Sequence, residues 1–429
     1  MDGQGLTVLF MPESAYGPTN NCIGIGDVLR RRGHRVVFAA EASWKGRLEP
    51  LGFGEDLVDL APPAAGGEQD AGQFWKEFIA STAPEFRKPT IEQLQTWIQP
   101  VWAELISGAR YCHDQLSAII DRVRPDIIVE DNVISFPALL TAGVPFVRIV
   151  SCNPLEVPDP ALPPAFSGYP AGAAGGRAEF RAEYDRVHRD MWAGYSQWVT
   201  EQGAPPLPEL EFIHPGALNL YVYPELADYR RGAPLDRSWH RLDSSVRETD
   251  AAFELPAGLA GGAGKLIYFS LGSLGSADIG LMRRIIGCLA DTPHRYIVSK
   301  GPLHAEIELA PNMWGAEFVP QTSVIPLADL VITHGGNNTT TECLHFGKPM
   351  IALPLFWDQY DNAQRVDELG LGVRLDTYGF SDTELRSAID RLLGDRGLAG
   401  RLARGAAQVQ SRHGLRLAAG LIEQAARPA

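Results

Sequence analysis

The sequence predicts an α/β protein built on parallel sheets, and three observations support this fold class. Short apolar runs rich in Val, Ile and Leu alternate with helical patterns along the chain, as expected for buried parallel strands joined by helices. The 429 residues exceed a single comfortable core, so two domains of roughly 200 residues each are expected. The composition, with 45% hydrophobic and 21% charged residues, is typical of a globular protein.

In the first half, four short apolar runs are predicted to form buried strands: Leu6–Met11, Arg35–Ala40, Asp126–Glu130 and Pro145–Val150. Between them, Cys22–Arg32 has a helical pattern that ends at Gly33, where a left-handed cap is favoured. Gly24 and Gly26 lie inside this helical pattern and lack a third glycine. They therefore do not predict a dinucleotide-binding turn, which needs its glycines between a strand and a helix.

The second half repeats the pattern, with strands predicted at Lys265–Leu271, Arg295–Ser299, Leu330–Thr333 and Met350–Leu355. Between the halves, Leu242–Gly264 is first polar and then rich in Gly and Ala, as interdomain linkers often are. We therefore expect one domain over residues 1–241, a linker over 242–264 and a second domain over 265–429. The last helix could pack back on the first domain.

Charge, cysteine content and hydropathy limit the partners that we expect. The formal net charge of −14 disfavours nucleic acids and anionic membrane surfaces. The five cysteines are scattered without metal-ligand spacing, and the chain has neither a basic, apolar leader nor a run as long as a membrane span. We expect reduced thiols and a cytoplasmic protein, as a monomer or homodimer, without integral membrane contact.

The first half holds two candidate borders of an acceptor cleft. The stretches Asp59–Gln73 and Val157–Arg177 are rich in Pro, Gly and Ala, although plain surface loops would have the same composition. Aromatic residues also gather in this half, at Phe74, Trp75, Phe78, Trp97, Trp102, Trp192 and Tyr195. They are compatible with an apolar or phenolic ligand, and equally with a packed helical core.

The clearest functional pattern lies in the second half. After the predicted strand Leu330–Thr333, the sequence His334-Gly-Gly336 turns the chain, and Asn337 or Asn338 can cap the helix that follows. Adjacent glycines let a bulky ligand approach the backbone, and the free amides at a helix start favour phosphate oxygens. We expect a diphosphate at this helix start.

Two further groups suit the rest of a nucleotide sugar. Glu342 lies four residues after Asn338, on the same face of the predicted helix. Its carboxylate can accept both hydroxyl protons of a ribose, which favours UDP over TDP. Asp358 and Gln359 follow the apolar run Met350–Leu355, where ligands of parallel sheets bind, so their side chains suit sugar hydroxyls. Glu342 could instead be an ordinary solvated helix residue.

The order of these pieces from Phe318 to Val366 resembles the donor-binding segment of the family 1 UDP-dependent glycosyltransferases, which include macrolide and plant natural-product enzymes. The resemblance implies a GT-B fold, in which two Rossmann-like domains face each other across a cleft. It assigns Phe318 and Gln321 to the base and ribose, Glu342 to the ribose hydroxyls, and Asp358 and Gln359 to the hexose. It assigns to the diphosphate Ser273, His334, Gly336, Asn338 and Thr339.

Two positions depart from this family. Phe318 stands where many members have Trp, which leaves a smaller stacking face for the base. Pro18, in Ala15-Tyr-Gly-Pro-Thr-Asn-Asn21, stands where the family has the His that removes the proton of the acceptor. Asp131 matches the Asp that orients this His, and it could act as the base, directly or through water, or have a structural role. Glu13 and Glu130 are weaker candidates, and His34 matches a structural helix-to-strand corner.

We therefore expect an inverting, metal-independent glycosyltransferase that moves a sugar, most plausibly glucose, from UDP to a small lipophilic, phenolic or acidic acceptor, as in antibiotic biosynthesis. A carboxylic acid acceptor would need no base, because it ionises near pH 4. Two alternatives stay open. One is a donor-binding pseudoenzyme or auxiliary subunit that has lost its base, and the other is a nucleotide-sugar epimerase with the GT-B fold.

Overall fold

The computed structural model describes residues 5–62, 71–262 and 264–427 and contains two parallel β-sheets. The first has seven strands in the order β3-β2-β1-β4-β5-β6-β7. They are β1 Thr7–Pro12, β2 Arg35–Phe38, β3 Gly54–Glu55, β4 Ile127–Asp131, β5 Phe146–Val150, β6 Leu218–Val222 and β7 Trp239–Leu242. The second has six strands in the order β10-β9-β8-β11-β12-β13. They are β8 Leu266–Ser270, β9 Arg295–Ser299, β10 Met313–Ala316, β11 Leu330–Thr333, β12 Met350–Ala352 and β13 Gly372–Arg374.

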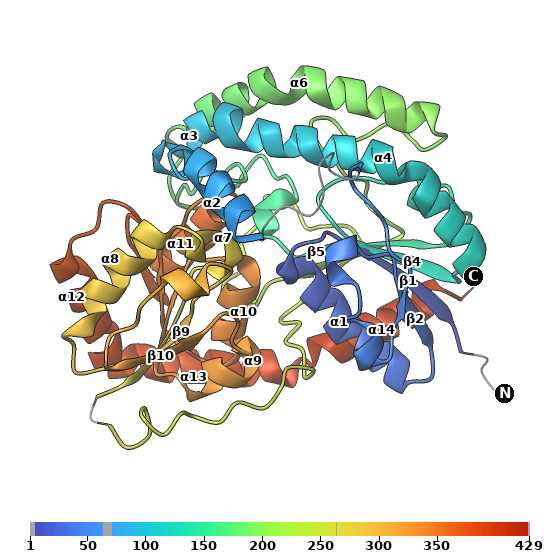
Figure 1. Ribbon diagram of the computed structural model, residues 1–429. Helices are drawn as coiled ribbons and strands as arrows, with labels where there is room; N and C mark the ends of the chain where they lie inside the picture. The colour runs from blue at the N-terminus through green and yellow to red at the C-terminus, as the bar shows by residue number, and fades with distance from the viewer. Residues whose placement is uncertain (1–4, 63–70, 263, 428–429) are drawn as a thin grey trace.

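Helices cover both sheets, and the two sheet-and-helix units lie side by side (Figure 1). The first half of the chain contains α1 Tyr16–Arg31, α2 Ala71–Thr82, α3 Thr90–Gln93, α4 Gln99–Val123, α5 Pro137–Leu140 and α6 Arg177–Glu201. The remaining helices are α7 Gly272–Ser276, α8 Ile279–Ala290, α9 Gln321–Val324, α10 Asn337–His345, α11 Gln359–Glu368, α12 Asp382–Gly394, α13 Arg396–Ser411 and α14 Gly414–Ala425. The alternation of strands and helices confirms the predicted α/β class.

The predicted elements differ from the observed ones mainly at their ends, and the strands β3, β6, β7, β10 and β13 were not predicted. The helix predicted from Cys22 begins at Tyr16, with Pro18 in its first turn, where a missing N–H costs no helical hydrogen bond. The strand predicted to reach Leu355 ends at Ala352. Pro354 has no N–H to donate to a strand ladder, and the Leu355 N–H instead donates to Gln359 Oε1 over 3.0 Å. The strands Arg295–Ser299 and Leu330–Thr333 lie where the sequence predicts them.

The C-terminal helix α14 lies against the first sheet rather than the second. It contacts α1, β6 and β7, and Figure 1 places it beside α1. His34, at the turn between α1 and β2, accepts a hydrogen bond from the Leu6 N–H over 3.0 Å, and its Nε2 lies 2.9 Å from Glu423 Oε1 of α14. The side chain thus joins the last helix to the first strand, which is a structural role.

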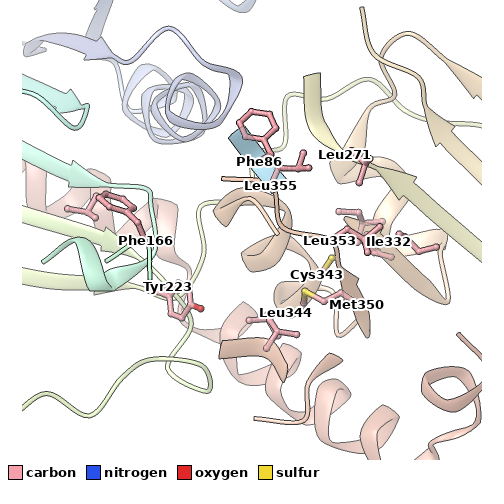
Figure 2. Packing of buried hydrophobic residues seen from close by; sticks show 14 of the residues in the cluster. Phe86, Phe166, Tyr223, Leu271, Ile332, Cys343, Leu344, Met350, Leu353 and Leu355 are labelled. Atoms are coloured by element: carbon pink, nitrogen blue, oxygen red, sulfur yellow. The ribbon is translucent and has the colours of Figure 1, made fainter. Parts of the chain in front are cut away.

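A continuous hydrophobic cluster links the two halves. It contains Phe166 and Tyr223 from the first half and Leu344 and Met350 from the second, all labelled in Figure 2. At the junction, the rings of Phe86 and Phe356 stack with centroids 5.0 Å apart. The halves are therefore held together by apolar burial, which stabilises at about 25 cal/mol per Å², and not by the connecting chain alone. No helix among the described residues has the length and hydropathy needed to cross a membrane.

Candidate functional site

The predicted donor residues gather at the carboxyl ends of three neighbouring strands. Thr333 at the end of β11 is in register with Ser270 of β8 and Ala352 of β12. Ser273 follows β8 in the short helix α7, His334 follows β11, and Asp358 follows β12. This edge of a parallel sheet is where ligands bind in such folds.

His334 is held between two glycines. A Cβ at Gly272 would lie 2.9 Å from His334 Cε1, and a Cβ at Gly336 would lie 2.6 Å from His334 Nε2, so neither position accepts a larger residue without movement. Gly272 also has φ +70°, which glycine adopts at little cost. Burial lowers the pKa of His334 to about 4, so the imidazole is neutral at pH 7.

The helix α10 starts differently from the prediction. Its N-cap is Gly336, and neither Asn337 nor Asn338 caps it with a side chain, so that prediction is wrong. Both side chains instead bond to the first half of the chain. Asn337 Nδ2 donates to the Val222 carbonyl over 3.1 Å, and Asn338 Nδ2 donates to the Gly17 carbonyl over 2.9 Å. Both asparagine side chains therefore bond to backbone carbonyls of the first half and not to the first-turn N–H groups of α10. Those N–H groups lie at the carboxyl end of β11.

Gln321, Thr339 and Glu342 form one hydrogen-bonded group. Gln321 Nε2 donates to Thr339 Oγ1 over 3.1 Å and to Glu342 Oε2, while Tyr268 donates to Gln321 Oε1 over 3.2 Å. Glu342 is 3% exposed. It is therefore not the solvated helix residue that the sequence left possible. The three side chains come from two helices and fix each other's orientation.

Arg247, between the two sheets, also reaches Glu342. Its Nη1 lies 3.3 Å from Glu342 Oε1, and its Nε and Nη2 bond to both carboxylate oxygens of Asp250 over 2.8 and 2.9 Å. Asp250 in turn accepts from the Thr322 hydroxyl over 2.9 Å. Burial raises the pKa of Glu342, and the Arg247 guanidinium and Gln321 amide counteract that rise.

Phe318 follows β10 and is 49% exposed. Its ring centroid is 5.5 Å from that of Tyr16, at the start of α1, and Tyr16 is 39% exposed. The Tyr16 hydroxyl accepts a hydrogen bond from Arg47 Nη1 over 2.7 Å. An exposed aromatic face at this edge can stack on a planar ligand.

Asp358 and Gln359 are buried at the start of α11. Asp358 Oδ2 accepts from the Asn153 N–H over 2.8 Å and from Asn362 Nδ2 over 3.2 Å. Gln359 Oε1 accepts a hydrogen bond from the Leu355 N–H over 3.0 Å, which stabilises the loop between β12 and α11. Burial raises the pKa of Asp358 to about 7, and the Asn153 N–H works against that rise.

Asp131, at the end of β4, is 2% exposed. Its Oδ1 accepts from the Ser151 hydroxyl over 2.7 Å, whereas its Oδ2 has no hydrogen-bond partner among the described residues. Burial raises the pKa of Asp131 well above its usual value, and the hydrogen bond from the Ser151 hydroxyl lowers the pKa in part. A carboxyl group with one free, buried oxygen and a raised pKa can take up a proton.

The two weaker candidates for the base have other surroundings. Glu13 accepts from the Ala15 N–H over 2.9 Å and from Ser14, so it orders the start of α1. Glu130 precedes Asp131 on the strand, and its side chain therefore lies on the other face of the sheet. No described histidine bonds to Asp131 in the place that Pro18 leaves.

Most of the aromatic residues suggested for an acceptor pocket pack in the core. Trp97 and Tyr195 are 8% and 0% exposed, and Trp192 Nε1 donates to the Pro208 carbonyl over 2.8 Å. Trp102, in contrast, lines a cavity. The side chains of Phe74 and Trp75 fall outside the described part of the chain. Within that part, no three His, Cys, Asp or Glu side chains are grouped as a metal site requires.

Sequence reasoning missed four residues that surround this site: Asn21, Ser151, Asn153 and Arg247. Asn21 Nδ2 donates to Asn338 Oδ1 over 3.0 Å. Ser151 and Asn153 directly follow β5, so the rule for the carboxyl ends of parallel strands could have found them. Arg247 lies in an irregular segment, and no local pattern indicates its contact with Glu342.

Comparisons with known proteins give a family match in the second half of the chain and relatives along its whole length. Residues 249–399 match the family model of UDP-glucuronosyl and UDP-glucosyl transferases. Over 96% of this chain and 88% of the relative, the sequence is 26% identical to the oleandomycin glycosyltransferase of Streptomyces antibioticus. The matched segment contains the residues from Ser273 to Gln359 that the sequence predicts to bind the donor.

Solved structures show the same fold. The glycosyltransferase of kitacinnamycin superposes with a TM-score of 0.72 at 20% identity, covering 99% of this chain and 100% of that one. The glycosyltransferase VinC, solved in complex with dTDP, superposes with a TM-score of 0.67 at 16% identity, covering 98% and 99%. The predicted GT-B architecture is thereby confirmed. Residues 249–399 thus match the family of UDP-glucuronosyl and UDP-glucosyl transferases, and the whole chain is similar to natural-product glycosyltransferases in sequence and in fold.

Proposed function

We propose that this chain is an inverting hexosyltransferase that moves glucose from UDP-glucose to a small lipophilic acceptor. The observation that carries the proposal is the buried group of Gln321, Thr339 and Glu342 at the start of α9 and on α10. Its carboxylate is oriented by neighbours and can accept two vicinal hydroxyls of a ribose. A deoxyribose offers one hydroxyl fewer, so this group favours UDP over TDP.

The other donor groups complete the nucleotide sugar in order. Phe318 supplies an exposed ring for the base, and the first amides of α10 with the neutral His334 supply N–H donors for the diphosphate. Ser273, Gly336 and Asn338 border the same space, while Asp358 and Gln359 bond to the hexose hydroxyls. Donors fixed before the reaction stabilise the charge that develops on the departing diphosphate, without any required metal or cofactor.

In the transfer step, the acceptor oxygen bonds to the anomeric carbon from the side opposite UDP. The bond from that carbon to the diphosphate oxygen breaks, its electron pair leaves with UDP, and the configuration inverts. Asp131 takes the proton of an alcohol acceptor on its free oxygen, directly or through one water. An acceptor that ionises by itself bypasses this step.

The donor is tested by calorimetric titration with UDP and TDP against the parent chain and Glu342→Gln. We expect tighter binding of UDP by the parent and a loss of roughly tenfold or more for UDP in the variant, because hydrogen bonds to a charged group are worth about 1.5–3 kcal/mol. The affinity for TDP should fall less. A parent chain that prefers TDP would refute the assignment of Glu342.

The reaction is tested by incubating the chain with UDP-glucose and panels of alcohols, phenols and carboxylic acids, with mass spectrometry of the products. A glucoside with inverted anomeric configuration supports the proposal. UDP binding without any product would favour a donor-binding pseudoenzyme or auxiliary subunit, and an epimerised sugar nucleotide formed without acceptor would favour an epimerase. Our proposal also places the chain in the cytoplasm as a monomer or homodimer, which fractionation and light scattering would test.

A further inference from the structure

A cavity of about 380 Å³ lies in the first half, among the ends of α4 and α6 and the segments that follow β5 and α6. Its lining is largely apolar and includes the rings of Trp102, Phe166 and Phe212 and the prolines Pro158, Pro163 and Pro164. The segment that the sequence suggested as a cleft border, Val157–Arg177, contributes much of it. Proline and aromatic rings present area at a low cost in side-chain entropy, which suits a rigid lipophilic ligand.

The cavity adjoins the sugar end of the donor site. The ring of Phe166 is 4.6 Å from that of Trp357, and the ring of Trp102 is 5.2 Å from it, measured between centroids. Trp357 directly precedes Asp358. In addition, the Phe166 N–H donates to Asp361 Oδ2 over 2.6 Å. A ligand in the cavity would therefore be next to the proposed hexose position.

Arg148 lines this cavity, and its guanidinium is not fully hydrogen-bonded. Its side chain extends from β5 and is 2% exposed. Its Nε has no hydrogen-bond partner, and no ion pair joins it to a described carboxylate, although the guanidinium lies 5.7 Å from the centroid of the Trp239 ring. Burial lowers the pKa of Arg148, and the fields of Glu156 and Glu211 counteract that shift. The Arg148 guanidinium thus interacts with Glu156 and Glu211 through longer-range electrostatic attraction and with the Trp239 ring by a cation–π contact.

Carboxylates outnumber guanidinium groups around the cavity. Its lining contains Glu156, Asp159, Glu209 and Glu211 against Arg148 and Arg181, and of these Glu209 is exposed and pairs with Arg189 over 3.2 Å. Asp159 accepts from the Ala161 and Gly232 N–H groups, both over 2.8 Å, and Arg181 bonds to backbone carbonyls, so these two charges are already engaged. Burial raises the pKa of both Glu156 and Glu211, and Arg148 works against both shifts.

A cationic group on a ligand would reduce the excess of negative charge around the cavity. Glu156 and Glu211 are partly buried, and neither has an ion-pair partner among the described residues; an opposite charge at hydrogen-bond distance would stabilise such a carboxylate. An anionic ligand on Arg148 would instead be repelled by both glutamates. The aromatic faces of Trp102 and Phe166 add a favourable surface for an alkylammonium group.

We propose that this cavity binds the acceptor and that the acceptor carries a basic nitrogen. Its ammonium group lies between Glu156 and Glu211, and its lipophilic body lies against the proline and aromatic wall. The inference rests on the proposed function, because it makes the ligand of this cavity the acceptor of the transfer. It goes further by assigning a charge to that acceptor.

Three probes of one shape test the proposal: 6-hydroxynaphthalenes that carry at carbon 2 a dimethylaminomethyl, an isobutyl or a carboxymethyl group. Their affinities are measured by calorimetry at pH 7 without donor, and transfer from UDP-glucose is followed in parallel. We expect the amine to bind at least roughly tenfold more tightly than its isobutyl isostere, and the carboxylate to bind most weakly.

Glu156→Gln and Glu211→Gln keep the shape of the cavity and remove one charge each. Each should reduce the preference for the amine over the isobutyl probe by roughly tenfold, with the affinity of the isobutyl probe little changed. Glu201→Gln is the matched control, because Glu201 is exposed at the end of α6, accepts a hydrogen bond from Gln197 and lies outside the cavity. Thermal unfolding checks that each variant is folded.

Equal binding of amine and isobutyl probes to the parent chain, tighter binding of the carboxylate, or an unchanged preference in both variants would overturn the inference. The donor half is measured separately by UDP titration. Normal UDP binding with no preference among the probes refutes only the charge of the acceptor. A preference for the amine without UDP binding or transfer would instead refute the proposed function.

Discussion

Arg247 Nη1 lies 3.3 Å from Glu342 Oε1, which places a guanidinium from the segment between the sheets against the carboxylate proposed for the ribose. Two effects on the pKa of Glu342 therefore oppose each other, because burial raises it and Arg247 lowers it. The contact couples the connecting segment to the proposed nucleotide site.

We predict that Arg247→Gln weakens UDP binding near neutral pH. Without the guanidinium, the pKa of Glu342 rises further, so the carboxylate that accepts the ribose hydroxyls is present only at higher pH. The affinity for UDP should fall by roughly tenfold for each unit by which the pKa of Glu342 exceeds the pH, and recover as the pH increases. Calorimetry between pH 6 and 9 checks this. Arg247→Lys, which keeps the charge, should resemble the parent chain, and equal pH profiles for both variants would contradict the prediction.

Transfer to alcohols should depend on the ionisation of Asp131. Because burial raises its pKa well above the usual value, the group is protonated at low pH and becomes a base only as the pH rises. The rate with an alcohol acceptor should therefore increase with pH. Asp131→Asn should lower it by about 100-fold or more, with little effect on a carboxylic acid acceptor.

Ser151→Ala provides a finer measurement on the same group. The Ser151 hydroxyl donates to Asp131 Oδ1 over 2.7 Å and so stabilises the ionised form. Its removal should raise the pKa of Asp131 and shift the rising limb of the pH–rate profile to higher pH. An unshifted limb would mean that another group governs the profile.

Replacing Phe318 by Trp should strengthen nucleotide binding. The ring is exposed beside Tyr16, and a larger stacking face should gain about 0.5–1.5 kcal/mol, or a few-fold in affinity for UDP. Phe318→Ala should lose a similar amount. Tyr111→Ala, at an exposed aromatic of α4, serves as the control and should leave UDP affinity unchanged. Equal effects at both positions would argue against stacking at Phe318.

Adding one methyl group at Gly272, next to His334, should lower both stability and UDP affinity. Gly272→Ala brings a Cβ to 2.9 Å from the imidazole at φ +70°, whereas Gly143→Ala has a similar φ of +75° and meets nothing within 4 Å. Both variants lose about 1 kcal/mol through the backbone alone. Only Gly272→Ala should lose more in the free energy of unfolding, measured in urea, and also lose UDP affinity. Equal losses would show that His334 moves aside freely.

By itself, the sequence determined the α/β class, the strands at Arg295–Ser299 and Leu330–Thr333, and the family that the segment from Phe318 to Val366 resembles. These features are local, because strand periodicity and helix-start glycines are encoded within a few residues of each other. Only the tertiary structure decided the partners of those residues: Asn338 bonds to Asn21 and Gly17, Asp358 to Asn153, and Glu342 to Arg247. Each pair is separated by about a hundred residues or more, and such contacts depend on how two sheets pack, which no local pattern encodes.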